Sequence, residues 1–310
     1  MVHILVTGCA GFIGFHLTAR LLQAGHDILG VDNLSTGQQR SVADLQAHAR
    51  FRFREHDITI PLSVEARFEQ IYNLACPASP ADFQTRRLEI LATCSAGVKN
   101  MLELARRCDA RLVHASTSEV YGDPQVHPQT EDYRGSVNPI GPRSCYDEGK
   151  RFAEALITAY RTQYGLETRL ARVFNTYGPR MRPDDGRCLP NFINQALRGE
   201  PLTVYGDGKQ TRSFCYVTDL VDGLVRLASC DVVEPVNLGS PSEIAIIDLA
   251  HEVIHLTGSD SSVSHTPAPP DDPQVRCPDI TRARRELDWQ PLVERSEGLF
   301  RTIEWFKSKT

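Results

Sequence analysis

The sequence lacks a cysteine pattern that would hold a metal ion or a disulfide framework. Its nine cysteines are an odd number, and they are scattered between positions 9 and 277 without a C-x-x-C pair. An odd and unpatterned set argues against both a zinc site and a fold held together by disulfides. We therefore expect no bound metal and reduced, buried or half-buried thiols, as in a cytoplasmic protein.

Long apolar segments and an excess of positive charge are also missing. No apolar run approaches the roughly 20 residues that a membrane helix needs. Residues 1–6 lead directly into a glycine-rich turn, which leaves no room for a signal peptide. The formal net charge is -5, whereas a nucleic acid or an anionic membrane would favour a basic surface. We expect a cytoplasmic protein with neither a nucleic-acid nor a membrane partner.

Short apolar runs alternate with helix-like stretches in the first part of the 310-residue chain. The predicted strands are 2–7, 27–31, 70–75, 111–115 and 167–174, and the predicted helices are 15–24, 88–108 and 146–164. Strands that alternate with helices indicate a parallel sheet covered on both faces. The sequence therefore predicts an α/β fold with a Rossmann-type doubly wound parallel sheet.

A glycine-rich turn follows the first predicted strand. The stretch TGCAGFIG supplies Gly8, Gly11 and Gly14, which permit a tight turn and a close approach of the backbone to a pyrophosphate at a helix N-terminus. Asp32 ends the next strand, where a carboxylate accepts hydrogen bonds from ribose hydroxyls and repels a 2′-phosphate. The context favours an NAD site over a merely structural turn. Asp57 either contacts the adenine or is a plain loop aspartate.

The amino-acid composition changes at Asn175, after which prolines and glycines become frequent. We assign residues 1–174 to an NAD-binding domain, with a returning segment near 212–239. Residues 175–310 form mainly a smaller C-terminal substrate-binding lobe. Within that lobe, 264–280 is too rich in proline to be helical.

The stretch CYDEGKR places Tyr146 and Lys150 four residues apart, on one face of a helix. An ammonium near a phenol favours the phenolate and lowers the pKa of the tyrosine from about 10 toward the working pH. Tyr146 is therefore a candidate base for a sugar hydroxyl. The spacing alone is typical of a solvated helix face, but the glycine turn and the strand ending in Ser116 and Thr117 favour catalysis.

These motifs together resemble the extended short-chain dehydrogenase/reductase family. The longer stretches STSEVYGDPQVHPQ, VNPIGPRSCYDEGKR, ARVFNTYGPRM, LTVYGDGKQTRSFCYV and DDPQVRCPDI are similar to the UDP-glucuronate decarboxylases, or UDP-xylose synthases, within that family. The resemblance covers nearly the whole chain. It implies oxidation of the sugar at C4 by NAD, loss of CO2 from the 4-keto intermediate, protonation at C5 and re-reduction at C4. It also implies a homodimer formed through helices 88–108 and 146–164.

The pair Ser118-Glu119 distinguishes between reactions within the family. The resemblance aligns it with the aspartate-glutamate pair of sugar-nucleotide 4,6-dehydratases, and serine is too weak an acid to protonate a leaving C6 hydroxyl. A 4-epimerase needs neither acid, so a retained glutamate that works at C5 favours decarboxylation. Glu119 either protonates C5, directly or through water, or its negative charge promotes loss of the substrate carboxylate as CO2. A glutamate that only caps the following turn is the structural alternative.

The resemblance also assigns site residues throughout the chain. Arg276 would close over the uronate, because a guanidinium can hold a carboxylate in bidentate fashion. The implied catalytic residues are Thr117, Glu119, Tyr146, Lys150 and Arg276. The expected cofactor contacts are Gly8, Gly11, Phe12, Ile13, Gly14, Asp32, Asn33, Asp57, Ile58, Leu74, Ala75, Tyr146 and Lys150. The expected UDP-glucuronate contacts are Pro77, Ser79, Thr117, Glu119, Tyr146, Asn175, Arg187, Asn191, Tyr205, Arg212 and Arg276.

The sequence departs from this family at Ala92, Cys94 and Pro190, where relatives carry a basic residue, asparagine and serine. These departures leave open a decarboxylase that acts on a modified UDP-uronate. A UDP-glucuronate 4-epimerase is a further alternative, and a non-catalytic NAD-sensing regulator is a third.

Overall fold

A computed structural model of the chain describes residues 2–268 and 273–309. Its largest sheet has seven strands, all paired in parallel, in the order β11-β6-β5-β4-β1-β2-β3. The strands are β1 (His3–Thr7), β2 (Asp27–Asp32), β3 (Phe51–Glu55), β4 (Gln70–Asn73), β5 (Arg111–Thr117), β6 (Thr168–Val173) and β11 (Val236–Leu238). From β1 the next strands, β2 and β3, are added toward one edge of the sheet, whereas β4, β5, β6 and β11 are added toward the other edge. This change in strand order between β1 and β4 opens a crevice at the carboxyl ends of the strands. The predicted doubly wound fold is confirmed.

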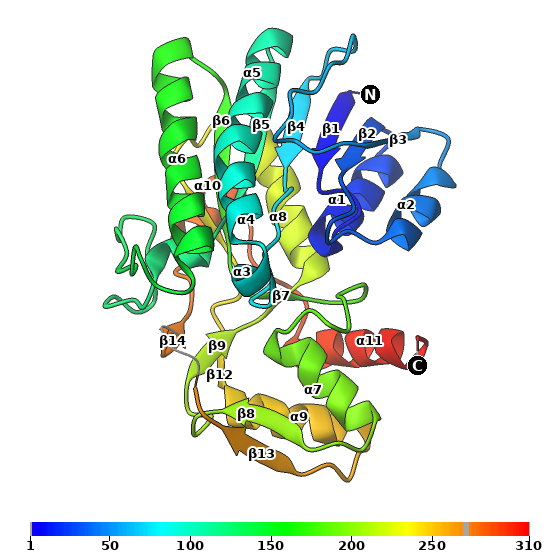
Figure 1. The fold of residues 1–310 in the computed structure, drawn as a ribbon, viewed down its shortest axis with the longest axis vertical. Helices are drawn as coiled ribbons and strands as arrows, with labels where there is room; N and C mark the ends of the chain where they lie inside the picture. The colour runs from blue at the N-terminus through cyan, green and yellow to red at the C-terminus, as the bar shows by residue number, and fades with distance from the viewer. Residues whose placement is uncertain (1, 269–272, 310) are drawn as a thin grey trace.

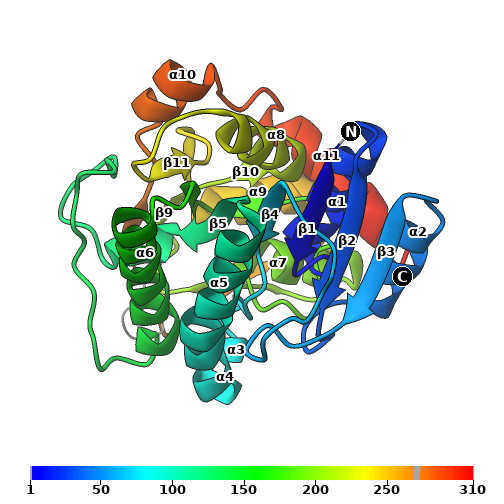
Figure 2. The same cartoon turned by 90° about the horizontal axis from the view of Figure 1, so that it is seen from above.

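Helices cover both faces of this sheet, as Figure 2 shows. On one face lie α1 (Phe12–Gln23), α2 (Gln39–Gln46), α8 (Val217–Ser229) and α10 (Thr281–Leu287). The other face carries α3 (Asp82–Thr85), α4 (Arg87–Ala92), α5 (Val98–Cys108) and α6 (Ser144–Tyr164). The alternation of side chains along β1 explains both layers: Ile4 and Val6 pack in the core beneath α1 and α8, whereas Leu5 packs in the core beneath α5 and α6.

A smaller lobe lies at the carboxyl end of the sheet (Figure 1). Its helices are α7 (Cys188–Leu197), α9 (Ile246–Thr257) and α11 (Arg295–Lys307), which bury apolar residues such as Phe192, Leu249 and Ile303 against one another. Its strands are β7 (Thr176–Tyr177), β8 (Leu202–Tyr205), β9 (Thr211–Ser213), β10 (Cys215–Tyr216), β12 (Glu243–Ala245), β13 (Val263–Thr266) and β14 (Val275–Arg276). The proline-rich segment supplies β13 and β14, and its residues 269–272 lie outside the described part of the chain.

Several predicted elements differ in detail, and α1 begins at Phe12, three residues before the predicted start. Strand β4 ends at Asn73 rather than at residue 75: the Leu74 amide divides its hydrogen bond between the Thr7 carbonyl oxygen and the Thr7 hydroxyl, and the Ala75 amide donates to that hydroxyl alone. The helix predicted over 88–108 contains a π-helical turn, Thr93–Gly97, between α4 and α5. Such turns recur at functional sites because they shift the side chains around them.

In the described residues, every helix is too short or too polar to cross a membrane.

Candidate active site

The turn after β1 presents bare backbone to the crevice. Gly8 has a φ of +73°, and a Cβ at this position would lie 2.9 Å from the Ala75 nitrogen. A Cβ on Gly14 would lie 1.9 Å from the Gly8 carbonyl oxygen, so α1 can begin this close to the turn only without a side chain there. These two positions therefore require glycine, which fits the expected pyrophosphate cradle at the start of α1.

A pocket extends from this turn along the carboxyl ends of β2, β3 and β4. Of the predicted cofactor contacts, Gly8, Gly11, Asp32, Asn33, Asp57, Ile58, Leu74 and Ala75 line it, together with Cys76, Pro77 and Thr93. Phe12 and Ile13 begin α1 and pack partly buried against the core beside it. The structure thus gathers residues from four separate loops into one elongated site.

Asp32 is held ready to accept hydrogen bonds at the end of β2. Its two carboxylate oxygens accept the amides of Ala10, at 3.0 Å, and Leu34, at 2.8 Å. Burial raises the pKa of Asp32, although these backbone hydrogen bonds oppose that rise. Each oxygen still has a free lone pair for a ribose hydroxyl. Asn33 donates to Asp57 at 3.1 Å, so these two predicted contacts form one edge of the pocket.

The catalytic candidates meet where β5 ends against α6. The Lys150 ammonium donates to the Ala115 carbonyl oxygen at 2.7 Å and lies 5.8 Å from the centre of the Tyr146 ring. The Tyr146 hydroxyl also shares a hydrogen bond with the Thr117 side chain. Thr117 and Lys150 therefore both lie next to Tyr146. The Ser116 hydroxyl is directed elsewhere, because it donates to Glu154 on α6 at 2.6 Å.

The pKa of Tyr146 differs from the expectation. The sequence pattern predicts a value lowered by Lys150, but burial raises the pKa of Tyr146 to about 12, and the lysine only partly offsets this effect. The ring is 7% exposed and stacks on Phe83, with ring centres 4.8 Å apart. Desolvation of a phenolate outweighs one favourable charge in such a place, so Tyr146 carries its proton at neutral pH in this structure.

Glu119 lies between two guanidinium groups. Arg143 donates to one carboxylate oxygen at 2.6 Å, and Arg276 forms a short ion pair with the other. Burial alone would raise the pKa of Glu119, but the charges of Arg276 and Arg143 outweigh it and lower the pKa to about 2. Glu119 is therefore a carboxylate at neutral pH. The turn after β5 is capped by Thr117, which accepts the Glu119 amide at 3.2 Å, so the Glu119 carboxylate is not the cap.

Asp147 is a second buried acid next to this cluster. It is 6% exposed, and its Oδ1 atom has no hydrogen-bond partner. Burial, and then the negative charge of Glu119, raises the pKa of Asp147 to about 7. Its nearest cation is Arg143, at 3.9 Å between Nε and Oδ2. The site thus holds one carboxyl group that is firmly ionised and another that titrates near neutral pH.

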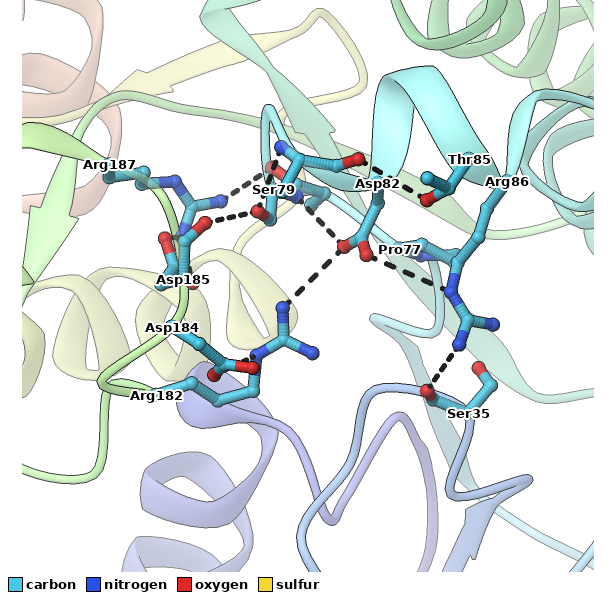
Figure 3. Close-up of polar contacts among 12 residues, drawn as sticks. Ser35, Pro77, Ser79, Asp82, Thr85, Arg86, Arg182, Asp184, Asp185 and Arg187 are labelled. Atoms are coloured by element: carbon cyan, nitrogen blue, oxygen red, sulfur yellow. Dashed lines mark hydrogen bonds and ion pairs between the residues drawn. The ribbon is translucent and has the colours of Figure 1, made fainter.

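A polar bridge joins the loop after β4 to the lobe (Figure 3). Ser79 donates its hydroxyl to the Asp185 carbonyl oxygen, and Arg187 donates to the Ala78 carbonyl oxygen at 2.6 Å. Asp82, the first residue of α3, lies 3.9 Å from Arg182. The predicted substrate contacts Ser79 and Arg187 are therefore brought together, and the bridge connects the cofactor pocket to the second lobe.

The remaining predicted substrate contacts extend from this site into the lobe. Arg212 and Arg276 are register partners in the paired strands β9 and β14. Asn175 lies just beyond β6, where its carbonyl oxygen accepts the Cys215 amide at 2.9 Å. Tyr205, 43% exposed at the end of β8, and Asn191 on α7 lie farther out in the lobe and contact none of the catalytic candidates.

The sequence and the fold both match known proteins. The model of the NAD dependent epimerase/dehydratase family matches residues 4–239. This protein belongs to that family. The match confirms the resemblance to the extended short-chain dehydrogenases/reductases.

Within the NAD dependent epimerase/dehydratase family, several relatives are similar over almost the full chain. UDP-glucuronic acid decarboxylase 1 of Xenopus tropicalis is 52% identical over 306 residues, covering 99% of this chain and 72% of the relative. UDP-glucuronic acid decarboxylase 6 of Arabidopsis thaliana is 52% identical over 299 residues, covering 96% and 87%. The structure of UDP-glucuronic acid 4-epimerase from Bacillus cereus, in complex with UDP-glucuronic acid and NAD, superimposes with a TM-score of 0.89. It is 28% identical and covers 99% of this chain and 100% of that one.

Three residues at the site of this family member escaped the sequence analysis, and Cys94 was noted there only as a departure from the family. Arg143 lies one helical turn before Tyr146 and Asp147, and that spacing could have indicated it. Asp147, the first acid in CYDEGKR, has no spacing or neighbour in the sequence that distinguishes it from an exposed helix residue, so the sequence did not indicate that it lies at the site. Cys76 and Cys94 are 18 residues apart in sequence, and only the fold brings their Sγ atoms to 3.7 Å.

Proposed function

We propose that this protein converts UDP-glucuronate to UDP-xylose, with NAD as its cofactor. The observation that carries the proposal is Glu119, which is ion-paired with Arg276 and whose amide donates to the Thr117 hydroxyl. The chain in which this pair occurs is 52% identical to a curated UDP-glucuronic acid decarboxylase. The reaction consumes no external reductant, because the hydride taken from C4 returns to C4.

NAD fits the crevice that the glycine turn forms. Gly8, Gly11 and Gly14 would hold its pyrophosphate, and Asp32 would hold the adenosine ribose and disfavour a 2′-phosphate. When bound, the cofactor accepts and later returns the hydride at sugar C4. Phe12, Ile13, Asn33, Asp57, Ile58, Leu74 and Ala75 would complete its site.

Tyr146 would take the proton from the C4 hydroxyl during oxidation. To act as a base Tyr146 must first lose its own proton to solvent, because its pKa of about 12 keeps the phenol protonated, and positive charge nearby favours the phenolate. Burial would lower the pKa of Lys150, but acidic neighbours, with Cys76 the largest contributor, raise it, and the ammonium stays charged. Thr117 would orient the sugar hydroxyl, because its side chain already contacts Tyr146.

Oxidation at C4 places the uronate carboxylate beta to a ketone. The C5–C6 bond can then break, with its electron pair forming an enolate and CO2 leaving. Arg276 would first orient the substrate carboxylate by sharing its guanidinium between that group and Glu119. Because Glu119 is ionised, it would accept a hydrogen bond from a water molecule and orient it to protonate C5, and the hydroxide that remains would take a proton from solvent. In that role it is not itself the acid.

The structure of the Bacillus cereus 4-epimerase, with its TM-score of 0.89, favours a second candidate, an epimerase of the same substrate. An epimerase retains all six sugar carbons, whereas the decarboxylase releases one. Incubation with UDP-glucuronate and a trace of NAD, followed by the mass of the nucleotide-sugar product, separates the two. A product that keeps its carboxylate would contradict the decarboxylase proposal, and a modified UDP-uronate would be the substrate to test next.

The two parts of the chain divide the binding work in this proposal. Residues 1–174, with 212–239 returning to the sheet, would bind the cofactor, and 175–310 would mainly bind the UDP portion. The strand β11, which adds to the sheet, and the residues of the glycine turn support this division. Pro77 and Ser79 would contact the sugar, and Asn175, Arg187, Asn191, Tyr205 and Arg212 would contact the diphosphate and uridine.

We propose a homodimer formed through α4, α5 and α6. Three large apolar side chains lie exposed on this layer: Leu88 at 82%, Leu91 at 40% and Phe152 at 52%. A second copy of the chain would cover them and remove apolar surface from water. Light scattering after size-exclusion chromatography should show a dimer for the native chain and a monomer for Phe152→Glu. A native chain that elutes as a monomer at micromolar concentration would contradict this proposal.

A cytoplasmic location is a further proposal. The nine free cysteines support it, because reducing compartments keep thiols unpaired. Fractionation of cells that produce the protein should recover it with cytoplasmic markers, and recovery with an exported fraction would contradict it.

A further inference from the structure

Two cysteines without a role in the proposed reaction lie beside Lys150. Cys76 follows β4 in the loop that lines the cofactor pocket, and Cys94 belongs to the π-helical turn between α4 and α5. Their Sγ atoms are 3.7 Å apart. We propose that Cys76 and Cys94 form an oxidisable dithiol, a site of reversible modification that peroxide converts to a disulfide and that lowers turnover when it closes.

The geometry gives the two sulfurs different roles. Cys76 is half-buried and lines the pocket, whereas Cys94 is 1% exposed. A small oxidant that enters the pocket therefore reaches Cys76 first. A disulfide requires about 2.0 Å between the sulfurs, so closure needs a movement of less than about 2 Å from van der Waals contact. Among the described residues no three His, Cys, Asp or Glu side chains gather to hold a metal ion, so this pair offers two thiols alone.

The two thiols of the pair differ in acidity, because the hydrogen bond with Cys94 and then burial raise the pKa of Cys76. A hydrogen bond from Cys76 and the positive charge of Lys150 lower the pKa of Cys94 to about 7, against the effect of burial. Burial instead raises the pKa of Cys9 and Cys215, which lie in the core. Because the thiolate is the reactive form, Cys76 needs a base, and the Cys94 thiolate that it is hydrogen-bonded to can take its proton.

The chemistry balances with hydrogen peroxide as the oxidant. The Cys76 sulfur attacks one peroxide oxygen while its proton passes to the Cys94 thiolate; the O–O bond breaks, and the leaving hydroxide takes a solvent proton to become water, which gives a sulfenic acid on Cys76. The Cys94 sulfur then attacks that sulfur, an S–S bond forms, and the hydroxyl group leaves with the Cys94 proton as a second water. Two thiols lose two electrons in total, and one peroxide gains them.

The disulfide would change the site in two ways. It would remove acidic thiols beside Lys150, whose charge they help to hold. It would also pull the loop from Cys76 to Ser79 toward the π-helical turn, and Ser79 is one end of the bridge to Asp185. Small displacements of positioning groups slow catalysis strongly, so we expect about a tenfold loss of turnover.

Peptide mapping after peroxide treatment tests the disulfide directly, without relying on the proposed reaction. Trypsin cuts at Arg67, Arg86, Arg87 and Lys99, so Cys76 and Cys94 fall in two separate peptides, 68–86 and 88–99, which contain no other cysteine. Under non-reducing conditions the two peptides should appear as one linked species that dithiothreitol separates. If peroxide leaves the peptides unlinked, or converts either thiol only to sulfinic or sulfonic acid, the proposal is wrong.

Variants connect the link to its effect on turnover, each compared with its own reduced activity. Cys76→Ser and Cys94→Ser should each abolish the linked peptide and the dithiothreitol-reversible loss. Cys145→Ser, a neighbouring cysteine in the same apolar cluster, should keep both. Prior saturation with NAD should slow formation of the link, since it blocks the pocket. Reversible inactivation that persists in both single variants would contradict the assignment, as would an equal rate of linking with and without NAD.

Discussion

Replacing Glu119 by glutamine removes the one negative charge between the guanidinium groups of Arg143 and Arg276. The side chain keeps its shape, but its amide can accept a hydrogen bond on only one side, and its NH2 group then faces the other arginine. Arg276 is 3% exposed, so water cannot replace the lost partner. A buried cation without its counter-charge destabilises the folded protein.

The magnitude follows from the pKa of Glu119. Its ordinary value of 4.5 falls to about 2 in the folded protein, which corresponds to about 3 kcal/mol of favourable interaction with the charged form. Because the folded pKa is the lower one, this contribution is complete above pH 4.5 and is lost as the pH falls toward 2. Glu119→Gln should therefore lower the free energy of unfolding by about 3 kcal/mol near pH 7, and by less at lower pH.

Urea denaturation of both proteins over a pH series measures this difference. Glu297→Gln is the matched control, because Glu297 pairs with Arg301 at 2.6 Å while 51% exposed, and surface pairs contribute about 1 kcal/mol or less. Equal losses for Glu119→Gln and Glu297→Gln would refute the reasoning. So would a loss at Glu119 that stays constant from about pH 7 down to about pH 3.

Three other changes test separate parts of the site. Tyr146→Phe removes the proposed base and should lower kcat by at least about 100-fold with little change in KM; undiminished turnover would remove Tyr146 from the mechanism and favour a non-catalytic NAD-sensing role. Asp147→Asn removes an acid whose pKa rises from 3.8 to about 7 on folding, which makes native stability fall as pH rises through that window. Thermal melting should show the variant gaining stability relative to the native chain between about pH 4 and 7, and parallel curves would contradict this. Gly14→Ala places a methyl group 1.9 Å from the Gly8 carbonyl oxygen and should cost about 1–3 kcal/mol of stability and weaken NAD binding in calorimetry; unchanged binding would contradict the tight turn.

Periodic sequence patterns were enough to predict the sheet. Apolar runs such as 2–7 and 111–115 match β1 and β5 closely. Each of these strands is buried on both faces of the sheet, so it appears in the sequence as a nearly continuous apolar run. The glycine turn and Asp32 then predict the pocket at the carboxyl ends of the strands. The π-helical turn could not be predicted, since Thr93–Gly97 continues the same helical periodicity as its neighbours.

Contacts between distant segments limited what could be predicted of the site. Arg276 and Glu119 are 157 residues apart, and the resemblance to a family, rather than any local pattern, placed both at the site. The predicted direction of the Tyr146 pKa shift was wrong. The four-residue spacing indicates that a lysine lies near Tyr146, but it does not indicate that the ring is buried against Phe83. Burial depends on the whole fold.

The fate of the uronate carboxyl carbon tests the proposed reaction most directly. The measurement is NMR of UDP-glucuronate labelled with carbon-13 at C6, incubated with the protein and NAD in deuterium oxide. The account predicts that the label leaves as CO2 and bicarbonate, while the nucleotide sugar becomes UDP-xylose with one solvent deuterium at C5. A label that stays in a six-carbon UDP-uronate inverted at C4 would contradict it.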